Sequence, residues 1–170
     1  MSPSTLIPRR TTGDALLRVM TPLHDAWMAD ADQILEPMTR WEATFWDRWA
    51  AVNYLREQFP ERLRLEQELL TELHAFLTPE LNERLRMQIE RLVRLHHDLE
   101  QMGQRRVPAS EMARAVRELL EALRLWYAEI ELAAGGIRRT DIGTQADQVL
   151  GRIEHSVLQP DFCSVCCSSE

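Results

Sequence analysis

The sequence has 170 residues, which is about the length of one domain with a single core. Its formal net charge of −7 argues against a nucleic-acid surface, because binding to phosphates needs a positive field. All 20 basic residues are arginine, which excludes both a Schiff-base lysine and a phosphate-loop lysine. The sequence shows neither a run of roughly 20 apolar residues that would span a bilayer nor the apolar core of a signal peptide. We therefore expect a cytoplasmic protein with no membrane partner and no nucleic-acid partner.

Apolar residues recur at helical spacing along the first half of the chain. The first predicted helix runs from Gly13 to Glu36, and His24 lies near the centre of its apolar arc. The second runs from Pro37 to Phe59, and Pro60 then either kinks it or begins another helix that ends near Leu77. The apolar face expected for the second helix, with Trp46 and Tyr54 left off it, consists of Trp41, Phe45, Trp49, Val52, Leu55 and Phe59.

The clearest amphipathic helix runs from Pro79 to Met102, with Thr78 as its expected N-cap and His96 at the shoulder of its apolar face. Ser110 is expected to cap the next helix, which ends at Ala134. That helix carries Trp126 on its apolar face and Glu131 at the shoulder, whereas Leu125 and Leu132 project from the opposite side. A last helix is predicted from Thr140 to Leu158.

These segments predict an all-α protein, an up-down antiparallel four-helix bundle with an additional C-terminal helix packed outside it. The bundle domain is expected to span 13–158, between a flexible N-terminus at 1–12 and a flexible tail at 159–170. The tail carries Cys163, Cys166 and Cys167, whose spacing suits a soft metal or a redox pair, with His155 as a further ligand. The alternative is a cysteine tail with no particular role.

Four successive segments each place one metal-ligating side chain on or beside an apolar face. These residues are His24, Glu66, His96 and Glu131. Imidazole and carboxylate groups that project from facing helices into a bundle core build non-haem metal sites. The plainer interpretation is that each is a polar residue on a helix shoulder, reaching solvent or hydrogen-bonded to a neighbour.

Three runs resemble the second, third and fourth helices of the hemerythrin-like cation-binding family: RLRLEQELLTELHAFLTPEL, RLVRLHHDLEQM and VRELLEALRLWYAEIELAAGGI. The resemblance implies a four-helix bundle around non-haem iron, with His24, Glu66 and His96 at ligand positions. Arg62 stands where the second helix would offer histidine. Trp126 and Ile130 stand where the fourth would offer histidine and glutamate, with Glu131 one residue late. The resemblance thus implies a reduced site that holds a single iron or zinc for binding or sensing, rather than a turnover enzyme.

The runs TRWEATFWDRWAAVNYL and RLRLEQELLTELHAF are similar to helices of the regulator-of-sigma-D (anti-sigma) family. This similarity implies a metal-free regulatory module that binds a protein partner or a second copy of itself. Leu125 with Leu132 offers an apolar contact, and an acidic surface suits a basic helix. The acidic residues of that surface are Glu57, Glu61, Glu68, Glu72, Glu83, Glu90, Glu118 and Glu121.

Overall fold

The computed structural model describes residues 12–40, 42–105 and 107–137, and this part of the chain is all-helical, with no strand. The predicted helix from Thr140 to Leu158, the cysteine tail, His155 and residues 1–11 lie outside the described residues. The five α-helices are α1 (Thr12–Leu35), α2 (Phe45–Asn53), α3 (Phe59–Leu73), α4 (Pro79–Gln104) and α5 (Ala109–Gly135). Shorter elements are the 3₁₀ turns η1 (Glu36–Thr39) and η3 (His74–Phe76), and the π-helical turn η2 (Tyr54–Gln58).

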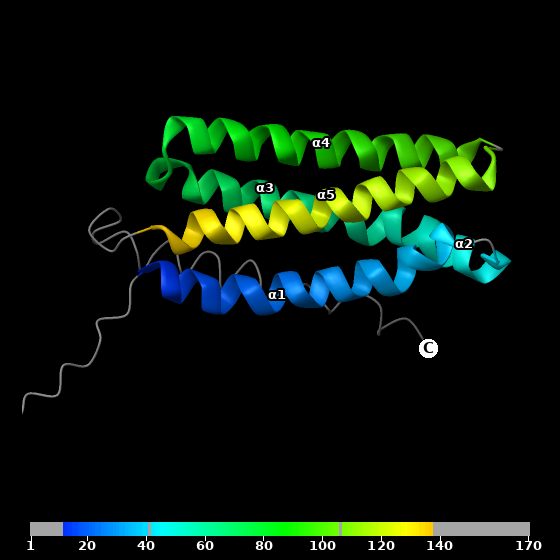
Figure 1. Ribbon diagram of the computed structural model, residues 1–170, viewed down its shortest axis with the longest axis horizontal. Coiled ribbons are helices and arrows are strands. Elements are labelled where there is room, and N and C mark those ends of the chain that lie inside the picture. The colour runs from blue at the N-terminus through cyan, green and yellow to red at the C-terminus, as the bar shows by residue number, and fades with distance from the viewer. Residues whose placement is uncertain (1–11, 41, 106, 138–170) are drawn as a thin grey trace, which may run out of the picture.

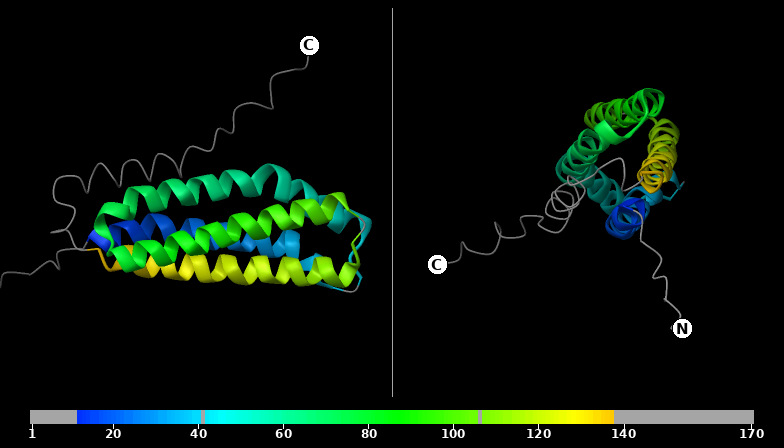
Figure 2. Two further views of the ribbon diagram at one scale, coloured as in Figure 1. Left: turned by 90° about the horizontal axis from the view of Figure 1, so that it is seen from above. Right: turned by 90° about the vertical axis from the view of Figure 1, so that its left-hand side faces the viewer.

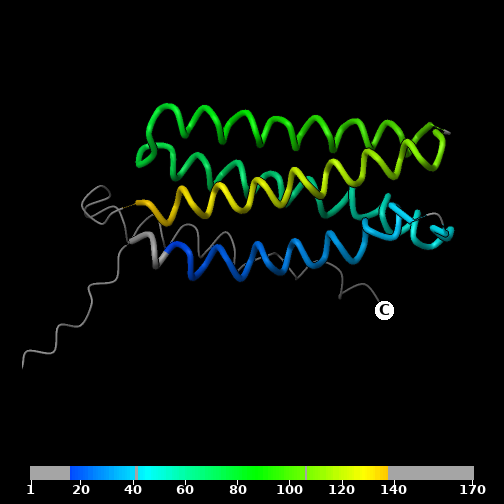
Figure 3. Tube along the Cα trace, viewed as in Figure 1, coloured from blue at the N-terminus to red at the C-terminus, as the bar shows by residue number. Residues whose placement is uncertain are grey.

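The long helices lie side by side along the length of the molecule, and α2 lies at one end (Figure 1). Helix α5 packs against both α1 and α4, and α4 also packs against α3. Viewed end-on, the helices surround a common centre, and the chain passes back and forth between the two ends (Figures 2 and 3). The core consists of aliphatic and aromatic side chains from every α-helix. No described helix combines the length and the apolar character needed to cross a bilayer.

Helix starts follow local hydrogen bonding. The predicted N-cap Thr78 is confirmed, because its hydroxyl accepts the backbone N–H of Leu81 at 3.3 Å. The predicted cap at Ser110 is wrong: α5 begins at Ala109 directly after Pro108, which carries no side-chain cap. Proline already fixes a φ of −58° there and gives the chain a defined entry into the helix.

The second predicted helix begins later than expected. Pro37 lies in the 3₁₀ turn η1, and regular helix starts only at Phe45, where Thr44 and Asp47 form a reciprocal capping box. The burial predicted for this helix is wrong in three places: Phe45 is 70% exposed, Trp49 is 56% exposed and Tyr54 is buried. The cause is the π turn, which contains one extra residue. This residue rotates the side chains of α2 by about 100° around the helix axis relative to those of α3.

The π turn has an identifiable origin in Pro60. The N–H of Phe59 bonds to the carbonyl of Tyr54, five residues back, and Pro60 has no N–H to offer to Leu55. The Leu55 carbonyl is therefore left without a backbone donor. It accepts instead from Nε2 of His96 on α4, at 2.6 Å. The helix thus continues through Pro60 with a register shift, and a side chain from a neighbouring helix satisfies the freed carbonyl.

Candidate functional site

His24, Glu66 and Glu131, from α1, α3 and α5, meet in the interior. The Nδ1 atom of His24 lies 2.7 Å from Oε1 of Glu131, within hydrogen-bonding distance. On the other side of the ring, Nε2 faces Oε1 of Glu66 at 3.3 Å, without the geometry of a hydrogen bond. The side chains of His24 and Glu66 are 2% and 3% exposed, and that of Glu131 is 23% exposed. One imidazole is therefore held between two carboxylates.

The second oxygen of each carboxylate is also bonded. The indole N–H of Trp126 donates to Oε2 of Glu66 at 2.8 Å, and the hydroxyl of Thr21 donates to Oε2 of Glu131 at 3.0 Å. Tyr127 stacks on the imidazole of His24 with ring centroids 4.4 Å apart. These contacts make a continuous polar network through the core, in which the carboxylates are fixed from outside and the ring is fixed from its face.

The charges of this network favour a protonated histidine. Burial by itself lowers the pKa of His24, but the two carboxylates that face its ring, Glu66 and Glu131, outweigh burial and raise the pKa above 6.5. Burial also raises the pKa of Tyr127 well above 10, so the stacked phenol stays neutral. When His24 is protonated, its imidazolium supplies the positive charge that two clustered carboxylates need in a nonpolar interior.

Arg62 adds a second polar cluster beside the first. Its guanidinium donates to the carbonyl of Trp27 at 3.2 Å, to the hydroxyl of Tyr54 at 2.9 Å and to Asp30 at 2.7 Å. It also lies over the rings of Trp27 and Tyr54, at 5.7 and 5.2 Å from their centroids. Burial raises the pKa of Tyr54 to about 12. At this position, where the hemerythrin-like pattern has histidine, arginine ties α3 to α1 and η2.

His96 is used elsewhere. It is buried, as its place on α4 predicted, but its Nε2 donates to the Leu55 carbonyl and its ring stacks on Phe59 at 5.1 Å. No hydrogen bond, ion pair or ring contact joins His96 to His24, Glu66 or Glu131. Three of the four predicted ligand residues therefore come together, and the fourth supports the π turn.

The donor set at the cluster is small for a metal. Nδ1 of His24 and both oxygens of Glu131 are already in hydrogen bonds, and Oε2 of Glu66 accepts from Trp126. This leaves one nitrogen and one oxygen facing each other, whereas zinc normally takes four ligands. In the part of the chain that the structure describes, no group of three or more His, Cys, Asp or Glu side chains has an arrangement that could hold a metal ion.

Known proteins give no further guide. Comparison of the chain with family models, curated proteins and solved structures returns no match. Both resemblances therefore stay hypotheses, and the function has to be argued from the molecule itself.

A surface feature escaped the sequence analysis. Phe45, Trp46 and Trp49 on α2 are 70%, 70% and 56% exposed, and their rings meet edge to face at 5.4 and 6.3 Å. We call these three residues the aromatic cluster. The signal that could have found it is the Thr44-x-x-Asp47 capping box, which marks Phe45 as the true helix start.

The acidic surface is more neutral than the sequence suggests. Five of the eight glutamates predicted to form it are paired with arginines of this chain, mostly one helical turn away on the same helix. These are Glu61, Glu68, Glu83, Glu90 and Glu118. A glutamate with its own arginine attracts a basic partner less strongly than a free one does.

Proposed function

We propose that this chain is a metal-free protein-interaction module, with an up-down antiparallel four-helix bundle as its scaffold. The observation that carries the proposal is the exposure of Phe45, Trp46 and Trp49 together on one short helix. Large aromatic side chains are enriched at the energetic centres of protein interfaces, and contiguous apolar patches are uncommon on surfaces that bind nothing.

The local structure supports this interpretation of the aromatic cluster. The capping box of Thr44 and Asp47 begins α2 directly before Phe45, and the π turn connects α2 without a break to α3. The cluster therefore stands on a continuous helical segment that the core holds at its other end. An anchored surface binds with less loss of conformational entropy than a loose one.

The histidine–glutamate cluster serves the scaffold in this proposal. His24 replaces a metal as the central cation, and Trp126 gives Glu66 the donor that it needs. Two of the positions where the chain departs from the hemerythrin-like pattern, Arg62 and Trp126, thus supply hydrogen bonds to interior polar groups without a metal.

Affinity capture from an extract of the source cells tests this function. The wild-type chain is compared with a variant that carries Trp46→Ser and Trp49→Ser, and the retained proteins are measured by quantitative mass spectrometry. Met87→Ser is the matched control, because Met87 is 58% exposed on α4, outside the cluster and away from Leu125 and Leu132. We expect a specific partner that the control retains and the tryptophan variant loses. The same retained proteins with all three chains would contradict the proposal.

A further inference from the structure

A hollow of about 450 Å³ lies beside the aromatic cluster, between the η1–α2 segment and the turn that joins α4 to α5. Its apolar lining includes the partly buried side chains of Met38, Met102 and Met112. Three exposed arginines, Arg40, Arg48 and Arg105, also line it. Methionine is flexible and polarisable, and it is common on surfaces that adapt to apolar side chains.

The hollow and the aromatic cluster are neighbours on α2. Arg48 and Val52 line the hollow, and at 100° per residue Phe45 lies about 20° around the helix from Val52. A ligand that enters the hollow along α2 therefore meets the aromatic cluster next. This continuity favours a ligand that extends beyond the hollow over one that fits inside it.

The charge of the hollow is locally positive, although the chain as a whole is negative. Among the residues that the structure describes, no carboxylate lines it. Among the described residues, Arg48 and Arg105 form no ion pair, and Arg40 reaches Glu36 only at 3.8 Å. Elsewhere on the surface, Arg64 of α3 and Arg86 of α4 are each paired with two glutamates. Two arginines without an ion pair, Arg48 and Arg105, therefore lie where the apolar lining is accessible.

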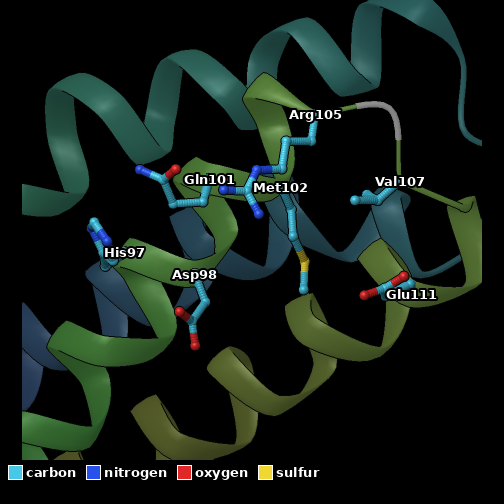
Figure 4. Close-up of a pocket in the computed structure, with 7 residues that line it drawn as sticks. All are labelled: His97, Asp98, Gln101, Met102, Arg105, Val107 and Glu111. Atoms are coloured by element: carbon cyan, nitrogen blue, oxygen red, sulfur yellow. The ribbon is translucent and has the colours of Figure 1, made fainter.

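The outer side of this region is acidic. A smaller hollow of about 270 Å³ shares Met102, Arg105 and Val107 with the first and is also lined by Asp98 and Glu111 (Figure 4). Figure 4 shows Arg105 and Met102 at the end of α4, with Val107 and Glu111 across the turn from them. A third hollow, which shares Arg40 and Ala43 with the first, is lined by Glu42 and Asp47. Carboxylates therefore border the first hollow on both sides, and the surface that attracts an anion is confined to the arginines that line it.

We propose that the hollow and the aromatic cluster together bind an acidic segment of a partner protein, which inserts a large apolar side chain between the methionines and places its carboxylates on Arg48 and Arg105. This inference rests on the proposed interaction function and specifies its partner. It also replaces the basic helix that the acidic surface suggested as a partner.

A nucleic acid or an anionic membrane fits the same features less well. Both are extended polyanions, and a chain of net charge −7 repels them at a distance, whereas a short acidic segment meets mainly the local arginines. The apolar lining also has no use for a phosphate group but matches a leucine or phenylalanine side chain.

Methyl NMR of the full chain with labelled methionine tests the proposal. The probe is a short peptide in which glutamates alternate with leucines at helical spacing. We expect the methyl signals of Met38, Met102 and Met112 to shift on titration. Those of Met20, which is buried in α1, and Met87, which is exposed in the first half of α4 and fifteen residues before Met102, should stay in place. Single-stranded RNA and vesicles of anionic lipid are titrated in parallel.

Charge reversals complete the test. Arg48→Glu should weaken the peptide roughly fivefold or more, and Arg105→Glu should act in the same direction. Arg18→Glu is the matched control, because Arg18 is an exposed arginine near the start of α1, at the other end of the molecule from α2 (Figure 1). A peptide with lysine in place of glutamate, and one with serine in place of leucine, should both bind more weakly.

Four results would overturn the inference: no shift of the three methionines, equal binding of the lysine peptide, no effect of either charge reversal, or tighter binding of RNA or vesicles. Capture of a partner through Trp46 and Trp49 would then still stand, so this failure differs from failure of the proposed function. Conversely, if the tryptophan substitutions leave the captured proteins unchanged, the proposed interaction function is itself contradicted.

Discussion

The indole of Trp126 donates its N–H to Glu66 in the fully buried centre of the molecule, with 2.8 Å between nitrogen and oxygen. A buried carboxylate needs a donor or a counter-charge for each oxygen, and here the tryptophan serves one oxygen while His24 faces the other. The interior polar network consequently depends on a residue that its size alone would assign to hydrophobic packing.

Trp126→Phe should destabilise the fold by about 1–3 kcal/mol, because Glu66 loses a buried donor and the smaller ring leaves space. Urea unfolding followed by far-UV circular dichroism measures the change. The exposed Trp46→Phe serves as control and should stay within about 0.5 kcal/mol of wild type. If the two substitutions cost the same, the hydrogen bond contributes nothing to stability. Repeating Trp126→Phe in a Glu66→Gln background separates the bond from the lost ring volume.

Stability should fall as the pH rises above neutrality. The raised pKa of His24 means that its contribution is fully present below 6.5 and is lost as the pH passes through the higher pKa of the folded state. The groups that face the ring are Glu66 from α3, Glu131 and the neutral Tyr127 from α5, and Thr21 bonded to Glu131 from α1.

His24→Gln should abolish this alkaline decline, as measured by the free energy of unfolding in urea at a series of pH values. His97→Gln is the control, because His97 is exposed on α4 and should leave the decline unchanged. If the stability of the wild type stays constant between about pH 6 and pH 9, Glu66 and Glu131 do not raise the pKa of the His24 imidazole in the folded state.

The bond between His96 and Leu55 should couple energetically to Pro60. His96→Leu removes the donor of a buried carbonyl and should cost about 1–3 kcal/mol. In a Pro60→Ala background the new backbone N–H can serve that carbonyl, so the same change should cost less, by about 1 kcal/mol. A double-mutant cycle by chemical denaturation measures the difference. Strict additivity would mean that the missing N–H of Pro60 is not the reason for the contact.

The chain should bind far less than one equivalent of iron or zinc when it is purified without chelator. The reason is that few atoms are free to coordinate a metal. In the His24–Glu66–Glu131 cluster, only one nitrogen of His24 and one oxygen of Glu66 are left without hydrogen bonds. Elemental analysis gives the answer directly. A full equivalent that disappears on His24→Ala, but persists on His97→Ala, would establish the reduced metal site that the hemerythrin-like resemblance implies.

Helical periodicity was sufficient to predict α1, α4 and α5 and the buried positions of His24 and Glu66. The reason is that α1, α4, α5 and the part of α3 that carries Glu66 each keep one helical register. It failed for Phe45, Trp49 and Tyr54, since a single π turn changes the phase within one apparent pattern. It also could not predict the hydrogen-bond partner of His96. The partner of that ring is a backbone carbonyl 41 residues away, left open by the missing N–H of Pro60.

The π turn also divides the helical segment from Phe45 to Leu73 into two stretches, and the two stretches are under different structural constraints. Residues after Phe59 must keep the spacing that fills the core, whereas residues from Phe45 to Asn53 are out of phase with it. Substitutions on the exposed face of α2 can therefore accumulate without altering the pattern on which folding depends. A change of partner over evolutionary time would be recorded in α2 and in the turn between α4 and α5, while α3 kept the residue spacing that fills the core.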